Sequence, residues 1–258
     1  MALIAFSSEL PFTALMNKLF GGVALSVMEQ VGVHAHDPAH PIPNWMAMQF
    51  LVAGVLLLFF AFLRTRLSVE KPGGWQHLLE GVHTFIQNQS REIIGHHSEA
   101  YTPFLVALGL FIFTANMVGV VPGFESPTAN PSVPLGCAVA AFAYYNWQGV
   151  RKQGVVHYAA HFAGPSDPSM SLFIRLPLAI VMVPIEIISH LARMLSLTVR
   201  LFANIFAGDM VTLVFFSLVP VGVPVAFNLL HVGVSFLQAY IFVLLTTVYL
   251  AGAVAEEH

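Results

Sequence analysis

The sequence predicts an all-α integral membrane protein, in which about three transmembrane or interfacial helices precede a hairpin of two long, strongly tilted membrane helices. Of its 258 residues, 57% are hydrophobic and 9% are charged, whereas about 25% charged residues are usual in soluble domains. The apolar residues form several runs of about 17–25 residues, the length that a membrane-spanning helix requires. The single cysteine, Cys137, excludes an intrachain disulfide.

Residues 1–44 are expected to form an N-terminal lead, either a short amphipathic segment or a poorly ordered one. They lack the basic start, continuous apolar core and small-residue cleavage site of a secretory signal. Three histidines, His34, His36 and His40, open the alternative of a metal site. A solvated, proline-rich loop is the preferred interpretation, because no ordered scaffold is predicted to hold the ligands.

Residues 45–152 are expected to contain the first membrane helices. Apolar runs predict three spans, at about 46–63, 103–121 and 135–147. Between the first two, apolar residues recur at helical spacing beside polar ones, which predicts an amphipathic helix at 75–98 lying on the membrane surface. Asn116 lies near the end of the second span, where hydrogen bonding at a helix end explains it without a transport role.

The basic residues predict the orientation of the chain. In a three-span arrangement, Lys18 alone lies on one side and seven basic residues lie on the other; the seven are Arg64, Arg66, Lys71, Arg91, Arg151, Lys152 and Arg175. Because cytoplasmic segments carry the excess of Lys and Arg, the N-terminus is expected outside and the C-terminus in the cytoplasm.

Residues 153–258 are expected to form a tilted helical hairpin. The chain is almost continuously apolar from Leu172 to about Val219, with neither Gly nor Pro between Ile185 and Ala207. No turn is therefore signalled inside this run, although its helical length approaches twice the hydrocarbon thickness of about 30 Å. A single, steeply tilted helix is predicted.

A second long helix is predicted to return from about Val225 to Gly252, after a turn around Pro220 and Gly222. Residues equally far from the turn face each other in an antiparallel hairpin. Asp209 and His231 satisfy this condition with respect to Pro220, so we expect them to form a close pair. By the same register Gln238 lies opposite Arg200. Nine residues separate Arg200 from Asp209, so the two point to nearly opposite sides of an ideal helix. Either Gly208 allows a local distortion or Gln238 touches only the flank of Arg200, and we expect the second.

A polar stripe runs along the first hairpin helix. Its members recur every three or four residues and are Glu186, Ser189, Arg193, Ser196, Arg200 and Asn204. An arginine at membrane depth costs roughly 2.5–3.5 kcal/mol on insertion scales, so the stripe must face water, a partner protein or both. The alternative is a structural salt-bridge network, but Arg200 has no carboxylate three or four residues away.

Titratable groups flank Arg200 on both sides. With the predicted orientation, Glu186 lies on its cytoplasmic side, and Asp209 and His231 lie on its outer side. Because a guanidinium does not deprotonate in proteins, a proton relay is interrupted at Arg200, and each flank behaves as a half-channel. Ser235 and Gln238 share a face with His231; plain hydrogen bonds between membrane helices are an alternative explanation for these three.

Two stretches carry a resemblance to a known family. LTVRLFANIFAGD (197–209) resembles the arginine-containing helix of subunit a of the F-type ATP synthase, the stationary proton-channel subunit. HVGVSFLQAYIFVLLTTVY (231–249) is similar to that family's last helix, and the closing AEEH resembles its C-terminus. The resemblance is specific over about residues 184–258 and looser over residues 100–150.

The resemblance implies partners and residue roles. A rotating ring of c subunits would bring a carboxylate past Arg200, peripheral-stalk b subunits would hold the chain still, and the soluble ATP synthase head would be coupled indirectly. The positions matched to proton translocation are Arg200, Glu186, Asn204, Asp209, His231 and Gln238, and those matched to half-channel lining are Ser189, Ser196 and Ser235. The chain departs from the family at Asp209, where Glu is frequent, and at Ala203, where Gly is common.

Other function classes fit less well. A self-contained proton or cation antiporter usually has inverted repeats around a midplane site, and this chain shows no convincing repeat. A membrane hydrolase would need a nucleophile–base motif, and an ATP-binding subunit a glycine-rich phosphate loop; neither is present. We therefore expect a non-catalytic subunit without a cofactor or nucleic-acid partner, in the bacterial inner membrane.

Overall fold

The computed structural model describes residues 9–32, 40–68, 73–95, 98–121, 123–155, 158, 172–218 and 222–255. These residues are helical, with two short 3₁₀ turns and no strand among them. The predicted all-helical class is confirmed. Three helices in the described ranges are long and apolar enough to span a membrane, namely Asn44–Arg66, Ile180–Leu218 and Val225–Val254. His34 and His36 lie outside the described residues.

The N-terminal lead contains a helix of 21 residues, α2 (Pro11–Val31), which is longer than the short segment expected there. Pro11 begins the helix at a position where a missing N–H costs nothing. Asn17 ties this helix to the chain before the next one, because its side chain both donates to and accepts from the backbone of Ile42. The following helix, α3 (Asn44–Arg66), contains the predicted first span.

The amphipathic pattern produces α4 (Gly74–Ile94). It ends four residues before the predicted limit because Gly95 takes a positive φ of 85°. A 3₁₀ turn, η1 (Ser98–Ala100), then leads into α5 (Thr102–Val118). Together with α5 and the last helix, α4 encloses an apolar hollow of about 650 Å³, lined on the α4 side by residues such as Leu78, Val82 and Phe85.

The predicted third span at 135–147 lies inside a longer helix, α6 (Ser132–Gln153). This helix is not among the three that are apolar enough to span a membrane by themselves. Its buried residues, which include Cys137, Ala141 and Tyr145, face neighbouring helices. Protein contacts therefore replace lipid contacts along that face and allow α6 to carry polar residues near its end. A 3₁₀ turn, η2 (Pro127–Ala129), precedes it.

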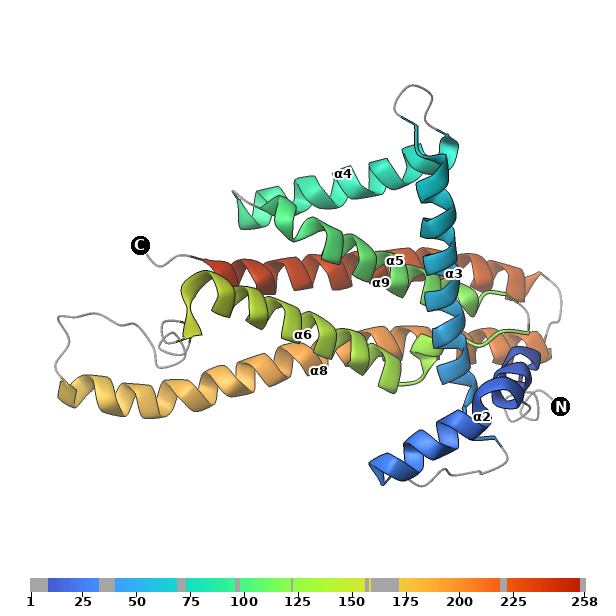
Figure 1. Ribbon diagram of the computed structural model, residues 1–258, viewed down its shortest axis with the longest axis horizontal. Coiled ribbons are helices and arrows are strands. Elements are labelled where there is room, and N and C mark those ends of the chain that lie inside the picture. Colours follow the sequence, from blue (N-terminus) through green and yellow to red (C-terminus); the bar gives the residue numbers. More distant parts are fainter. Residues whose placement is uncertain are drawn as a thin grey trace.

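The two last helices form the predicted hairpin. α8 (Leu172–Leu218) is one uninterrupted helix of 47 residues, and α9 (Val223–Val254) returns beside it. At about 1.5 Å per residue α8 is about 70 Å long, more than twice the hydrocarbon thickness. Figure 1 shows α3 running across the α8–α9 pair at a steep angle. If α3 crosses the bilayer directly, the hairpin must lie strongly inclined within it.

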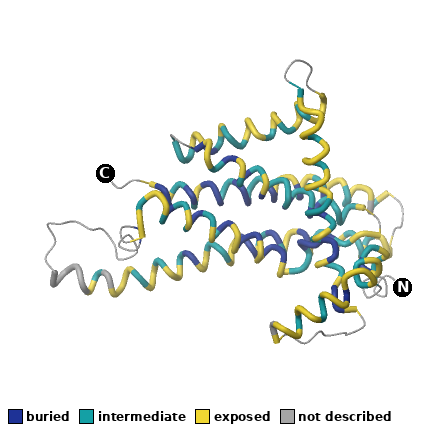
Figure 2. Tube along the Cα trace, viewed as in Figure 1, coloured by how far each residue is buried: buried dark blue, intermediate teal, exposed yellow. Residues whose placement is uncertain are grey.

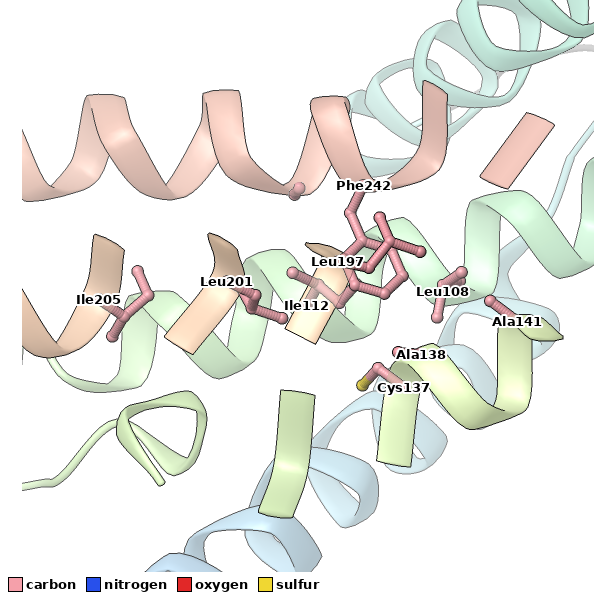
Figure 3. Close-up of a cluster of buried hydrophobic side chains, with 10 residues drawn as sticks. Leu108, Ile112, Cys137, Ala138, Ala141, Leu197, Leu201, Ile205 and Phe242 are labelled. Carbon is pink, nitrogen blue, oxygen red and sulfur yellow. The ribbon is translucent and has the colours of Figure 1, made fainter. Parts of the chain in front are cut away.

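One apolar core joins α5, α6, α8 and α9. Figure 3 shows Ile112, Leu201 and Phe242 converging from three of these helices, with Cys137 and Ala138 from α6. Gly109 permits close approach, because a Cβ there would lie 2.9 Å from a methyl of Val243. Buried residues concentrate where these helices meet, whereas residues 180–195 of α8 are largely exposed (Figure 2).

Candidate functional site

Helix α8 presents a buried face and an exposed face, and the predicted polar stripe lies along their border. Leu197, Leu201 and Ile205 are buried against the core. Arg200 is half-buried and Asn204 is exposed. On a helix with 3.6 residues per turn these positions lie beside the buried face rather than within it. The stripe is therefore within reach both of α9 and of whatever covers the exposed face.

The predicted contact between Asp209 and His231 is confirmed. His231 Nδ1 lies 3.5 Å from Asp209 Oδ1, and the imidazole is 6% exposed. Gly208 makes room for this contact, since a Cβ there would lie 3.1 Å from the same nitrogen. The hairpin register thus brings an acid and an imidazole together across two helices, an arrangement in which a proton can be shared.

Around this pair lie polar atoms that the protein itself does not satisfy. Within the described ranges, His231 Nε2, the Ser235 hydroxyl and Asn116 Nδ2 are buried and have no hydrogen-bonding partner. Ser235 follows His231 by one helical turn, and the His231 ring lies next to the Asn116 backbone. Buried polar groups are almost always hydrogen-bonded, often to internal water. The arrangement is typical of a hydrated path.

Glu125, in the loop before η2, is a further member of this group of residues. It interacts electrostatically with Asp209. Burial raises the pKa of Glu125 above its ordinary value, and a hydrogen bond from the Asn44 side chain offsets part of this rise. We call Asp209, His231, Ser235, Asn116 and Glu125 the Asp209 cluster.

The centre of the site contains Arg200 and an amide pair. The Asn204 side chain donates a hydrogen bond of 2.7 Å to Gln238 Oε1. Gln238 thus contacts Asn204, one turn of α8 beyond Arg200, and its expected contact with the flank of Arg200 stays a prediction. Among the described residues Arg200 has no ion pair. Its charge remains available to a group outside this chain.

A second group of titratable residues surrounds Glu186. His190 Nε2 lies 3.4 Å from Glu186 Oε1, and His190 Nδ1 lies 2.8 Å from the Tyr145 hydroxyl. The three side chains form a chain from α6 to α8. Glu186 is half-buried, whereas His190 and Tyr145 are buried.

Next to Glu186 lies a small cavity of about 100 Å³, and one of the side chains that line it is a further cation, Arg193. The Arg193 guanidinium lies over the Tyr249 ring at 5.2 Å from its centroid. The residues lining the cavity are Gln153, Tyr158, Glu186, His190, Arg193, Tyr249, Gly252 and Ala253. Gln153 ends α6, and Gly252 and Ala253 belong to the last turn of α9, so the cavity lies at that end of the molecule. We call Glu186, His190, Tyr145, Arg193 and Tyr249 the Glu186 cluster.

Comparison with known proteins identifies the family. The family model of the ATP synthase A chain matches residues 46–251. The chain is 49% identical over 250 residues to an ATP synthase subunit a from Koribacter versatilis, covering 97% of this chain and 98% of the relative. It is 54% identical over 220 residues to one from Solibacter usitatus, covering 85% and 91%. A Helicobacter pylori subunit a is 42% identical over 210 residues, covering 81% and 89%.

The chain belongs to the ATP synthase subunit a family. The resemblance predicted from the two C-terminal stretches is thereby confirmed over most of the chain. It follows that this is a multi-pass membrane subunit of the F-type ATP synthase, a complex of ATP synthesis and proton transport.

The residues predicted for proton translocation in this subunit a do not form one site. Asp209 with His231, and Asn204 with Gln238, form two contacting pairs between α8 and α9. Glu186 lies apart from both. Of the predicted lining residues, Ser235 is buried beside His231, Ser189 is half-buried and Ser196 is exposed. The last two therefore line the border and the exposed face of α8, not the packed interior.

Sequence reasoning missed His190 and Tyr145 and gave Asn116 a purely structural role. His190 was detectable, since it follows Glu186 by four residues and must share its face. Tyr145 was not, because its contact depends on how α6 packs against α8. For Asn116 the structural interpretation explains only one half of the amide: its Oδ1 accepts a 2.6 Å hydrogen bond from Thr128, while Nδ2 is buried and unsatisfied.

Proposed function

We propose that this chain is the stationary proton-channel subunit of the F-type ATP synthase, with two offset half-channels that meet a carboxylate of the c ring beside Arg200. One observation carries the proposal. The Glu186 cluster and the Asp209 cluster are separate, and Arg200 lies between them on α8. Glu186 and Asp209 are 23 residues apart, which is about 35 Å along the helix.

Arg200 suits the role of a barrier between the half-channels. Its guanidinium keeps its charge, so protons cannot be relayed through it, and a neighbouring carboxyl group loses its proton more easily. The exposed face beside it carries small side chains, among them Ser196, Ala203 and Ala207. Small residues allow membrane helices to approach closely. This face is therefore suited to the passing helices of a c ring.

The orientation of the chain assigns a side to each half-channel. The basic asymmetry of the sequence favours a cytoplasmic C-terminus. In Figure 1, α2 lies at the end of the molecule where α8 ends and α9 begins, and the last turns of α6 and α9 lie at the other end. On this assignment the Asp209 cluster opens to the outside, and the cavity of the Glu186 cluster opens to the cytoplasm.

In the synthesis direction a proton enters through the Asp209 cluster and neutralises a c-ring carboxylate. The neutral carboxyl group can enter the lipid because it carries no charge, whereas a carboxylate cannot. After rotation it returns to Arg200 from the other side, where the cation favours the charged form and the proton leaves through the Glu186 cluster. Each proton crossing about 200 mV releases roughly 4.6 kcal/mol, so several steps are needed per ATP.

The proposal implies a non-catalytic subunit. Its direct partners are a ring of c subunits, the peripheral-stalk b subunits that prevent it from turning, and the lipid bilayer. The soluble head, which makes ATP, is coupled only through these. The bacterial inner membrane is the expected location.

Replacement of Arg200 is the test. In the assembled complex we expect Arg200→Ala to abolish ATP-driven proton pumping while passive proton leak persists or rises, because both the attraction and the barrier are lost. Arg200→Lys should also fail in coupled transport, since an ammonium can deprotonate. Thr198→Val is the control, because the Thr198 hydroxyl bonds only the Met194 carbonyl of its own helix. Near-normal pumping by assembled Arg200→Ala complexes would refute the mechanism.

A further inference from the structure

His190 is placed where a proton leaving Glu186 would next arrive. Its Nε2 lies 3.4 Å from the Glu186 carboxylate and its Nδ1 lies 2.8 Å from the Tyr145 hydroxyl. The ring is 8% exposed and is held between the Phe142 and Tyr145 rings, with centroids at 5.9 and 5.8 Å. The imidazole is therefore fixed with one nitrogen toward the carboxylate and the other toward the phenol.

The partner of Nδ1 is suited to both charge states of the ring. When His190 is neutral with its proton on Nδ1, that N–H donates to the Tyr145 oxygen, and Nε2 is able to accept a proton. When His190 is protonated, Nδ1–H keeps the same hydrogen bond, because the hydroxyl oxygen accepts in both states. Tyr145 thus allows His190 to gain or lose a proton without losing the hydrogen bond that positions it.

The charged groups around His190 come from three helices and the segment after α6. Glu186 and Arg193 lie about one turn of α8 before and after His190, and their opposite charges act on the charge of the ring in opposite directions. Tyr145, Tyr158 and Tyr249 are the other titratable groups, and Tyr158 and Tyr249 line the same cavity. The Glu186 carboxylate and the Tyr145 hydroxyl are the groups next to the two ring nitrogens.

We infer that His190 is a proton carrier of the cytoplasmic half-channel, which takes the proton from Glu186 and passes it to water in the 100 Å³ cavity while Tyr145 holds the ring in both states. In the transfer, neutral His190 has its proton on Nδ1, which donates to Tyr145; the Glu186 O–H bond breaks and a His190 Nε2–H bond forms. The Nε2–H bond then breaks as the proton passes to cavity water, which restores the neutral ring. The cavity has room for about three waters at roughly 30 Å³ each. This inference rests on the proposed function and adds a carrier to it.

Two substitutions separate proton carriage from support of the fold. His190→Gln keeps an amide that can donate toward Glu186 and accept from Tyr145, but the amide cannot bind a proton. Tyr145→Phe keeps the ring packing and removes only the hydroxyl. Thr198→Val is again the control, since Thr198 is 7% exposed and His190 is 8% exposed on the same helix.

The measurement is ATP-driven proton pumping by the assembled complex, recorded as a function of pH on the cytoplasmic side and, separately, on the outer side. We expect His190→Gln to slow pumping at least threefold and to flatten its dependence on cytoplasmic pH alone. Tyr145→Phe should change the profile in the same direction by a smaller factor, and Thr198→Val should leave it unchanged.

Each other result overturns the inference. If assembled His190→Gln complexes keep the rate and the pH profile of the unmodified protein, the histidine only links α6 to α8. If the profile changes with outer pH instead, His190 belongs to the other half-channel. Failure of the proposed function is distinguishable from both outcomes, because it would appear as coupled pumping in Arg200→Ala whatever His190→Gln does.

Discussion

The Asp209 cluster and the Glu186 cluster differ in how far their own side chains satisfy one another. In the Asp209 cluster, three buried polar atoms, of His231, Ser235 and Asn116, have no partner within the described ranges. In the Glu186 cluster, the carboxylate, the imidazole and the phenol form a continuous chain beside a cavity. The Asp209 cluster therefore needs water to connect its members, whereas the side chains of the Glu186 cluster are already in contact.

The two clusters also differ in charge. Arg193 lies beside the Glu186 cluster, over the Tyr249 ring, so Glu186 has a permanent cation near it. Asp209 has instead a second carboxyl group, Glu125, close enough to repel it. The two acids therefore lie in different electrostatic surroundings, Asp209 beside a like charge and Glu186 beside an opposite one.

The largest expected effect comes from removing each acid. We expect Asp209→Asn to slow ATP-driven pumping about tenfold, because Asp209 is the carboxyl group in contact with His231 among the described residues. Glu186→Gln should slow it only about threefold, because cavity water can replace one relay group. Pumping is measured in inverted vesicles at equal complex content. Asp209→Glu and Glu186→Asp are the matched controls and should each recover most of the lost rate. A Glu186→Gln defect larger than that of Asp209→Asn would contradict the comparison.

Sidedness is the next expected difference. On a Cys137→Ala background, a membrane-impermeant maleimide should modify Glu186→Cys at least fivefold faster from the cytoplasmic side, and Asp209→Cys faster from outside. The controls for orientation are Phe124→Cys outside and Arg151→Cys inside, both at exposed positions.

If the faster-labelled side were reversed at positions 186 and 209 alone, the sides assigned to the two half-channels would have to be exchanged. Reversal at all four positions would instead show that the whole chain has the opposite orientation in the membrane.

Much of the fold could be predicted from the sequence, because membrane helices satisfy their backbone within one segment. The absence of Gly and Pro between Ile185 and Ala207 predicted the uninterrupted α8, and the turn near Gly222 set the register that pairs Asp209 with His231. The amphipathic pattern predicted α4, although its end depended on the backbone angle of Gly95.

The rest depended on packing between helices, which a single sequence does not encode in a readable way. The hairpin register placed Gln238 opposite Arg200, but its hydrogen bond with Asn204 depends on side-chain reach and could not be predicted from the register. Likewise the spacing of Glu186 and His190 was present in the sequence, but their link to Tyr145 required the position of α6. The extent of α2 was hidden because no apolar span marked it.

The smallest expected effect is the most direct test of hydration in the Asp209 cluster. Ser235 is fully buried, and its hydroxyl has no protein partner in the described ranges. If that hydroxyl binds water that connects His231 to the c ring, Ser235→Ala should slow pumping two- to threefold without changing assembly, since one link of the path is lost.

If the hydroxyl is simply unsatisfied, its removal should be neutral or stabilising, because an unpaired buried polar group costs about 1–3 kcal/mol. Ser217→Ala is the control, since Ser217 is exposed near the end of α8 and its hydroxyl bonds the Val214 carbonyl of its own helix; its pumping rate should differ from that of the unmodified complex by no more than about a third. Pumping rate and thermal stability of the complex, measured together, distinguish the two cases: a slower but equally stable Ser235→Ala complex supports a hydrated entry path, and a more stable one with normal pumping rules it out at this position.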